Sequence, residues 1–145
     1  MNHKPTNIYL DIDGILLVND GTPANHANDF LRLVLQKYPD TTYWLTTHCK
    51  GDANVPIARF GHMFEPDVAE LMLKIKTTNW DMSKTEAIDF SQPFLWFDDE
   101  LFISEERELN KHQAMANWIQ VNFRKDINQL QDFIRSFPIP VQPVD

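Results

Sequence analysis

The sequence predicts an α/β fold in which a parallel sheet is covered by helices on both faces. Short runs rich in β-branched and aromatic residues alternate along the chain with stretches whose apolar residues recur at helical spacing. The run over residues 94–97 is apolar throughout, as expected of a strand that is covered on both faces. We expect one domain over residues 1–137, large enough for a sizeable core, followed by a proline-rich tail over residues 138–145.

The first predicted strand spans residues 8–13, where Asp11 and Asp13 interrupt an apolar run and a glycine follows. Alternate side chains of a strand point the same way, so both carboxylates are expected on one side. A turn-rich segment then leads to a helix over residues 26–38. The β-branched and aromatic run over residues 42–46 predicts the second strand.

The middle of the chain is predicted to form shorter elements. A loop after residue 48 opens a short helix near residues 52–54, and a longer helix follows over residues 66–75. A weak short strand, the third, is expected near residues 77–80. The sequence from Ser83 to Glu86 has the form of a capping box, which predicts a short helix.

The last third of the chain repeats the alternation. The apolar run over residues 94–97 is the fourth strand, and a polar helix is expected after Ser104. Residues 117–122 predict the last strand. Asp126 is expected to cap a final helix whose apolar stripe reaches residue 137.

Chemically reactive side chains follow the strands or begin a helix at four places. They are Asp11 with Asp13, Thr46, Lys84, and Asp98 with Asp99. The carboxyl ends of parallel strands form ligand sites where strand order reverses, so we expect these groups to lie close together. Mg²⁺ between the carboxylates would reverse their repulsion toward a phosphate. A carboxylate could then attack phosphorus, while a hydroxyl and a lysine neutralise the transferred group.

The order of these motifs resembles the haloacid dehalogenase (HAD) superfamily. LDIDG, WLTTH, a lysine and LWFDDE follow one another between residues 8 and 99. The resemblance implies a Rossmann-like three-layer sandwich with parallel strand order 5-4-1-2-3, and Mg²⁺-dependent phosphohydrolase activity through an aspartyl phosphate. The stretches between the strands are too short for a second domain, so we expect a capless member with an open site.

The resemblance assigns a role to each matching position. Asp11 would be the nucleophile and a metal ligand. Asp13 would be the general acid and base, and its backbone carbonyl would bind the metal. Thr46 would hydrogen-bond the transferred phosphoryl group, and Lys84 would pair with that group and with Asp11.

The fourth motif would complete the metal site, with Asp98 as a direct ligand and Asp99 assisting it. Lys84 is preferred over the nearby Lys74 and Lys76 because it lies in the capping box. Four further side chains around the mouth of the site are candidates to bind substrate, although each could instead be a solvated loop residue. They are Thr47, His48, Lys50 and Arg59.

Composition narrows the partners and the compartment. A net charge of −8 argues against broad nucleic-acid binding, which needs a basic face. A single cysteine excludes an internal disulfide, and neither a signal peptide nor a run of about 20 apolar residues is present, so we expect a cytoplasmic protein without a membrane partner. The expected partner is a phosphorylated substrate, either a small molecule or an exposed macromolecular phosphate.

Three alternatives stay open at this point. A response-regulator receiver domain uses similar residues, but it needs its reactive Asp after a middle strand and its lysine on a late one. A metal- or phosphate-binding regulatory domain with the same fold would keep the motifs without useful turnover. The WLTTHCKGDAN run also resembles small capless HAD domains that are attached to RNA-repair proteins, which suggests a nucleic-acid-end phosphatase.

Overall fold

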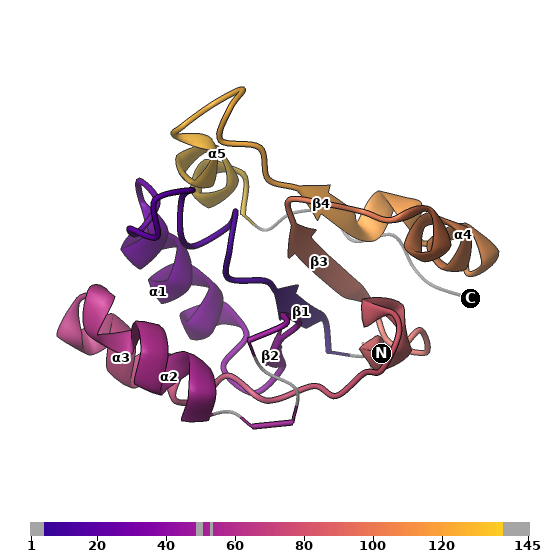
Figure 1. Cartoon of the computed structure of the whole chain (residues 1–145), viewed down its shortest axis with the longest axis horizontal. Coiled ribbons are helices and arrows are strands. Elements are labelled where there is room, and N and C mark those ends of the chain that lie inside the picture. The colour runs from indigo at the N-terminus through magenta and orange to yellow at the C-terminus, as the bar shows by residue number, and fades with distance from the viewer. Residues whose placement is uncertain (1–4, 49–50, 53, 138–145) are drawn as a thin grey trace.

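The structure is a computed structural model that describes residues 5–48, 51–52 and 54–137 (Figure 1). Within these residues, all strands join one parallel sheet in the order β2-β1-β3-β4. The strands are β1 (Asn7–Leu10), β2 (Thr42–Trp44), β3 (Phe94–Asp98) and β4 (Trp118–Gln120). The predicted α/β class with a parallel sheet is therefore confirmed. The predicted tail over residues 138–145 lies outside the described residues.

Helices cover both faces of the sheet and make three layers (Figure 1). The α-helices are α1 (Ala27–Lys37), α2 (Asn54–Phe60), α3 (Pro66–Met72), α4 (Ile103–Lys111) and α5 (Gln129–Ser136). Three short 3₁₀ helices occur in the described parts: η1 (Gly61–Met63), η2 (Lys84–Ala87) and η3 (Met115–Asn117). Pro66 begins α3, where its missing N–H leaves no hydrogen bond unmade.

The core is divided by the sheet into two apolar clusters. On β1, Ile8 and Leu10 pack into the cluster beneath α1, α3 and α5, whereas Tyr9 packs into the cluster beneath α4. Both kinds of position are buried, which explains why the strands are apolar without alternation. Trp44 and Trp96 are fully buried, and burial of a large apolar side chain contributes about 1.5–3 kcal/mol.

The expected five-stranded order 5-4-1-2-3 is not observed, because the described sheet has four strands. The third strand, expected near residues 77–80, does not form in the described part of the chain, and the other four keep the expected order. Near this segment, one described residue pairs with the free side of the edge strand β2: Lys76 forms an isolated parallel bridge to Tyr43. Beyond it, the hydroxyl of Thr78 donates to the carbonyl of Trp44. A side chain thus occupies the acceptor that a continuing strand would use, and the ladder ends.

Two local predictions were wrong. β1 ends at Leu10, so Asp11 directly follows the strand and Asp13 lies beyond its end, although both residues line one cavity. The Asp11 side chain is 11% exposed and the Asp13 side chain 66% exposed. Asp126 does not cap α5, because its carboxylate accepts the backbone N–H of Asn128 in a turn before that helix begins.

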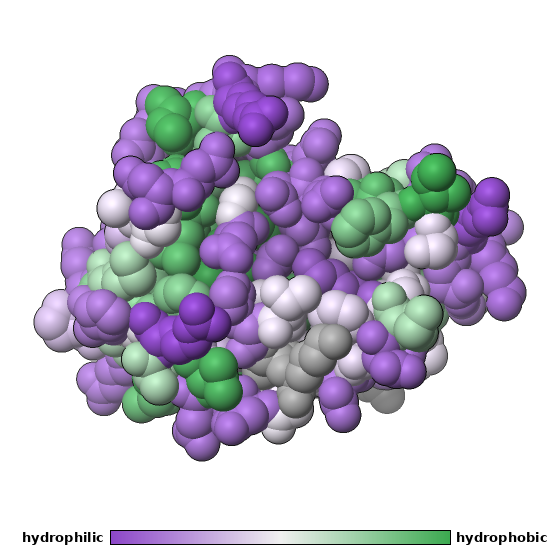
Figure 2. Space-filling view, viewed as in Figure 1, coloured by the Kyte–Doolittle hydropathy of each residue, from purple (hydrophilic) through white to green (hydrophobic). Residues whose placement is uncertain are grey.

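The described helices include none with the length and apolar character needed to cross a membrane. The face seen in Figure 2 is mostly hydrophilic, and its apolar side chains gather in separate small groups. One such group lies over the start of α4, where Phe102 and Ile103 are exposed.

Candidate metal centre

The candidate site lies where β1 and β3 end side by side. Leu10 pairs with Phe97 in the parallel ladder, so the next residues, Asp11 and Asp98, come out at the same edge of the sheet. The backbone N–H of Asp11 still donates to the carbonyl of Phe97, at 3.2 Å. The topology therefore brings together two carboxylates that are far apart in the sequence, as predicted from the strand ends.

Three carboxylates form a compact cluster at this edge. Asp11, Asp98 and Asp99 each offer an oxygen, and these atoms lie within 4.8 Å of one another. Asp98 is held by backbone hydrogen bonds to its Oδ1 from Asp99 at 2.8 Å and from Glu100 at 3.3 Å. Oδ1 of Asp11 accepts the backbone N–H of Ile12 at 2.7 Å. The two buried carboxylates are thus oriented by the backbone before any ligand binds.

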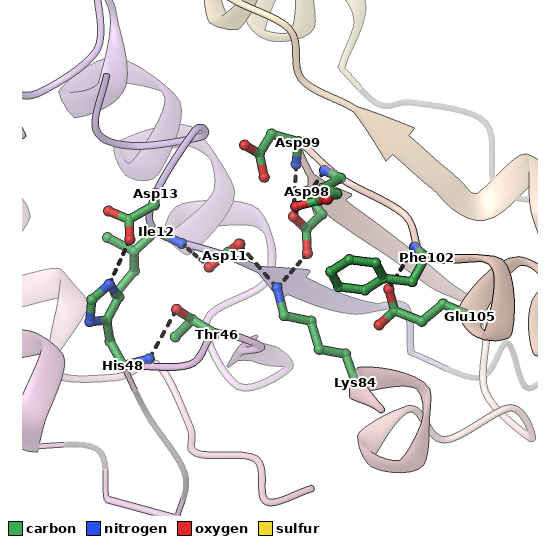
Figure 3. A network of polar contacts seen from close by, with 11 residues as sticks. Asp11, Ile12, Asp13, Thr46, His48, Lys84, Asp98, Asp99, Phe102 and Glu105 are labelled. Carbon is green, nitrogen blue, oxygen red and sulfur yellow. Dashed lines mark hydrogen bonds and ion pairs between the residues drawn. The ribbon is translucent and has the colours of Figure 1, made fainter. Parts of the chain in front are cut away.

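Lys84 provides the positive charge of the cluster (Figure 3). Its Nζ lies 3.0 Å from Oδ2 of Asp11 and 2.7 Å from Oδ2 of Asp98. The capping box that predicted η2 is present, and the Glu86 carboxylate accepts the backbone N–H of Ser83 at 2.7 Å. This cap fixes the backbone directly before Lys84, so the preference for Lys84 among the nearby lysines agrees with the geometry.

The charges of the cluster shift two pKa values upward. Burial disfavours the ammonium form of Lys84, but attraction to Asp11 and Asp98 outweighs burial and raises its pKa. Burial, and then repulsion from Asp11, raises the pKa of Asp98 to about 8, although Lys84 opposes this shift. One lysine therefore does not fully compensate the buried carboxylates, and an added cation would favour their ionised forms.

Gly14 makes room for the third carboxylate. Its φ is +80°, a conformation that favours glycine, and a Cβ at this position would overlap the carboxylate of Asp99. The turn after β1 and the acidic turn after β3 can approach each other only because this side chain is missing.

The donor atoms of the cluster fit a hard cation. All three candidate ligands are carboxylates, which suit Mg²⁺, Ca²⁺ or Mn²⁺, whereas zinc sites draw mainly on histidine and cysteine. The raised pKa of Asp98 and the close approach at Gly14 both agree with a cation between the two acidic turns. The Asp11, Asp98 and Asp99 group can therefore hold a metal ion.

A cavity of about 290 Å³ opens beside the cluster. Its wall includes Asp13, Glu100 and Glu105 in addition to the three clustered carboxylates. Among the described residues that line it, Lys84 is the only cation. The cavity is thus strongly acidic apart from one ammonium group.

Apolar side chains that sequence reasoning missed form the rest of the wall. They are Trp80, Met82 and Phe102. The Phe102 side chain points toward Lys84 and Asp98 in Figure 3. Its backbone N–H donates to the buried carboxylate of Glu105 at 3.0 Å, which fixes this 57% exposed residue in place. In the sequence, the signal for this apolar part of the wall was Phe102, a large apolar residue shortly after the Asp98-Asp99-Glu100 turn.

The other predicted residues divide into four groups. Thr46 is fully buried outside the cavity wall, and its hydroxyl accepts the backbone N–H of His48 at 3.3 Å. Thr47 lines the cavity and is exposed. His48 and Arg59 do not line the cavity; His48 contacts Asp13, and Arg59 contacts His48. Lys50 lies outside the residues that the structure describes.

Comparison of the chain with protein families, with curated proteins and with solved structures finds no match.

Proposed function

We propose that the protein is a Mg²⁺-dependent phosphomonoesterase of the HAD type, with an open site and an aspartyl-phosphate intermediate. The observation that carries the proposal is the placement of Lys84 between Asp11 and Asp98, 3.0 Å from the first and 2.7 Å from the second. A carboxylate beside a second acid and a buried ammonium is suited to attack an anionic phosphoryl group, provided a cation offsets the remaining charge.

Asp11, Asp98 and Asp99 would hold Mg²⁺ in this proposal. When bound, Mg²⁺ neutralises charge on the carboxylates and on the phosphoryl oxygens. Lys84 would bind a phosphoryl oxygen while it keeps Asp11 oriented. Its raised pKa keeps the ammonium charged at neutral pH, as this role requires.

The reaction would then proceed in two steps. A carboxylate oxygen of Asp11 bonds to phosphorus as the ester P–O bond breaks, and Asp13 donates its proton to the departing oxygen. In the second step Asp13 removes a proton from water, and this water attacks phosphorus. The aspartyl P–O bond breaks, which releases phosphate and restores the Asp11 carboxylate.

The cavity wall favours one class of substrate. The carboxylates of Glu100 and Glu105 would repel further negative charge on a leaving group. The exposed side chains of Phe102 and Met82 would instead contact an apolar or aromatic leaving group. We therefore favour small phosphate monoesters of uncharged, apolar or aromatic alcohols over nucleic-acid ends.

The test is hydrolysis of an aryl phosphate with and without Mg²⁺, for the wild type and Asp11→Asn. Asp40→Asn is a matched control, because Asp40 is exposed and precedes β2 at the opposite edge of the sheet. We expect turnover that needs Mg²⁺, is lost in Asp11→Asn and is kept in Asp40→Asn. Mg²⁺ binding without turnover on any phosphate ester would favour the regulatory alternative.

A further inference from the structure

Asp13 is the first member of a chain of polar contacts that leads away from the metal cluster. Nε2 of His48 lies 2.7 Å from Oδ2 of Asp13 (Figure 3). Nη1 of Arg59 lies 3.0 Å from Nδ1 of the same imidazole. Both nitrogens of His48 are therefore engaged, one by a carboxylate and one by a guanidinium.

Arg59 decides which nitrogen of His48 carries the proton. A guanidinium can only donate hydrogen bonds, so Nδ1 of His48 must accept and carries no proton. The proton of the neutral ring is then on Nε2, which donates to Oδ2 of Asp13. In this arrangement His48 is a neutral hydrogen-bond donor whose tautomer is set by Arg59.

The imidazole is held in place independently of Asp13. Its ring packs against the edge of Phe60, with centroids 4.9 Å apart and planes at 76°. The guanidinium of Arg59 lies 5.2 Å from the centre of the Phe60 ring, within the range of a cation–π contact. The backbone N–H of His48 donates to the buried Thr46 hydroxyl. The His48 side chain is only 17% exposed and forms a fixed support.

The position of this support argues against direct substrate binding. Asp13 lines the acidic cavity, whereas His48 and Arg59 do not. His48 therefore contacts Asp13 from outside the cavity, and Arg59 contacts His48 on its other side. The side chain of Asp13 is 66% exposed, and without a partner it would exchange among several rotamers.

We propose that His48 and Arg59 are positioning residues for Asp13. The mechanistic part of this inference rests on the proposed function, in which Asp13 is the general acid. Because Oδ2 of Asp13 accepts the Nε2 proton of His48, Oδ1 is the oxygen that would pass a proton to the departing oxygen in the proposed reaction. His48 would keep its own proton throughout.

The kinetic test compares leaving groups. A nitrophenyl phosphate needs little protonation as it departs, whereas an alkyl phosphate depends on it, and positioned acid catalysis contributes about 10²–10⁴-fold. We expect His48→Ala to lower kcat for the alkyl ester about tenfold more than for the aryl ester, with KM unchanged. His48→Gln, which keeps an N–H donor, should recover part of the loss.

Arg59→Ala should change the kcat values in the same direction as His48→Ala. Arg107 is an exposed arginine on α4, so Arg107→Ala is the control and should have no effect. A raised KM for both esters, with an unchanged ratio of their kcat values, would overturn the proposal and make His48 a substrate ligand.

A second measurement does not depend on turnover. Nitrogen NMR of the His48 ring should show a proton on Nε2 and none on Nδ1 in the wild type. Arg59→Ala should remove this preference, and Asp13→Asn should move the Nε2 signal. A proton on Nδ1, or signals that neither variant changes, would overturn the contact chain itself. A wild type without turnover would refute the proposed function. The NMR measurement would still decide whether the contacts from Arg59 through His48 to Asp13 exist.

Discussion

Nζ of Lys84 lies 2.7 Å from Oδ2 of Asp98, and both side chains are largely withdrawn from water, at 12% and 2% exposed. Loss of one partner from a buried pair leaves an uncompensated charge, which costs about 3–5 kcal/mol. We expect Lys84→Ala to lower the free energy of unfolding of the metal-free protein by about 3 kcal/mol above about pH 8, where Asp98 is ionised, and by less at neutral pH. Added Mg²⁺ should recover part of this loss.

Urea unfolding with and without Mg²⁺ measures both effects. Lys111→Ala, an exposed lysine in the last turn of α4, is the control and should change stability little. A loss from Lys84→Ala no larger than that of the control would contradict a buried charge cluster.

The pKa of Asp98, raised to about 8 by burial and then by Asp11, predicts how metal binding depends on pH. Mg²⁺ needs the ionised carboxylate and competes with the proton, so its affinity should rise with pH until about pH 8 and then level off. Calorimetric titrations with Mg²⁺ from about pH 6 to about pH 9 test this, and a flat affinity would contradict it.

The same shift affects the stability of the metal-free protein, with a definite sign. The pKa of Asp98 is higher in the folded state than in the unfolded state, so the folded state keeps this proton to higher pH. The resulting stability is fully present below about pH 4 and is lost as pH rises to about 8. The stabilisation by Mg²⁺ should therefore grow across this range, which thermal unfolding at each pH would reveal.

Gly14 and Gly21 form a matched pair for testing the approach of Asp99. Both have a positive φ, of 80° and 82°, so alanine should cost roughly 1 kcal/mol of backbone strain at either position. A Cβ at Gly14 overlaps the Asp99 carboxylate, whereas one at Gly21 meets nothing within 4 Å. Only Gly14→Ala should weaken Mg²⁺ binding. An equal loss of Mg²⁺ affinity in both variants would show that Asp99 does not contribute to the site.

Phe102 tests the substrate class. Its side chain is exposed in the cavity wall, so Phe102→Ala should leave stability nearly unchanged and raise KM for an aryl phosphate about threefold to tenfold. Ile103→Ala is the control, because its exposed side chain lies next in sequence but outside that wall. Faster hydrolysis of a terminal phosphate on an oligonucleotide than of aryl phosphates would instead favour the nucleic-acid-end alternative.

The convergence of Asp11, Lys84 and Asp98 could be predicted because each follows a strong local pattern. Two lie at the ends of apolar strands and one in a capping box, and parallel topology brings strand ends together. The missing third strand could not be predicted, since the Thr78 hydroxyl competes for a carbonyl on another element. The contact between His48 and Arg59 was also hidden, because it depends on how α2 packs after the loop.

In the proposed reaction, Asp11 carries the phosphoryl group during turnover. Rapid acid quenching of the enzyme with a labelled aryl phosphate and Mg²⁺, followed by peptide mapping, tests it directly. We predict a base-labile label on the peptide that contains Asp11, absent without Mg²⁺ and absent in Asp11→Asn. Turnover with no label on that peptide, or turnover that survives in Asp11→Asn, would show that Asp11 is not the nucleophile.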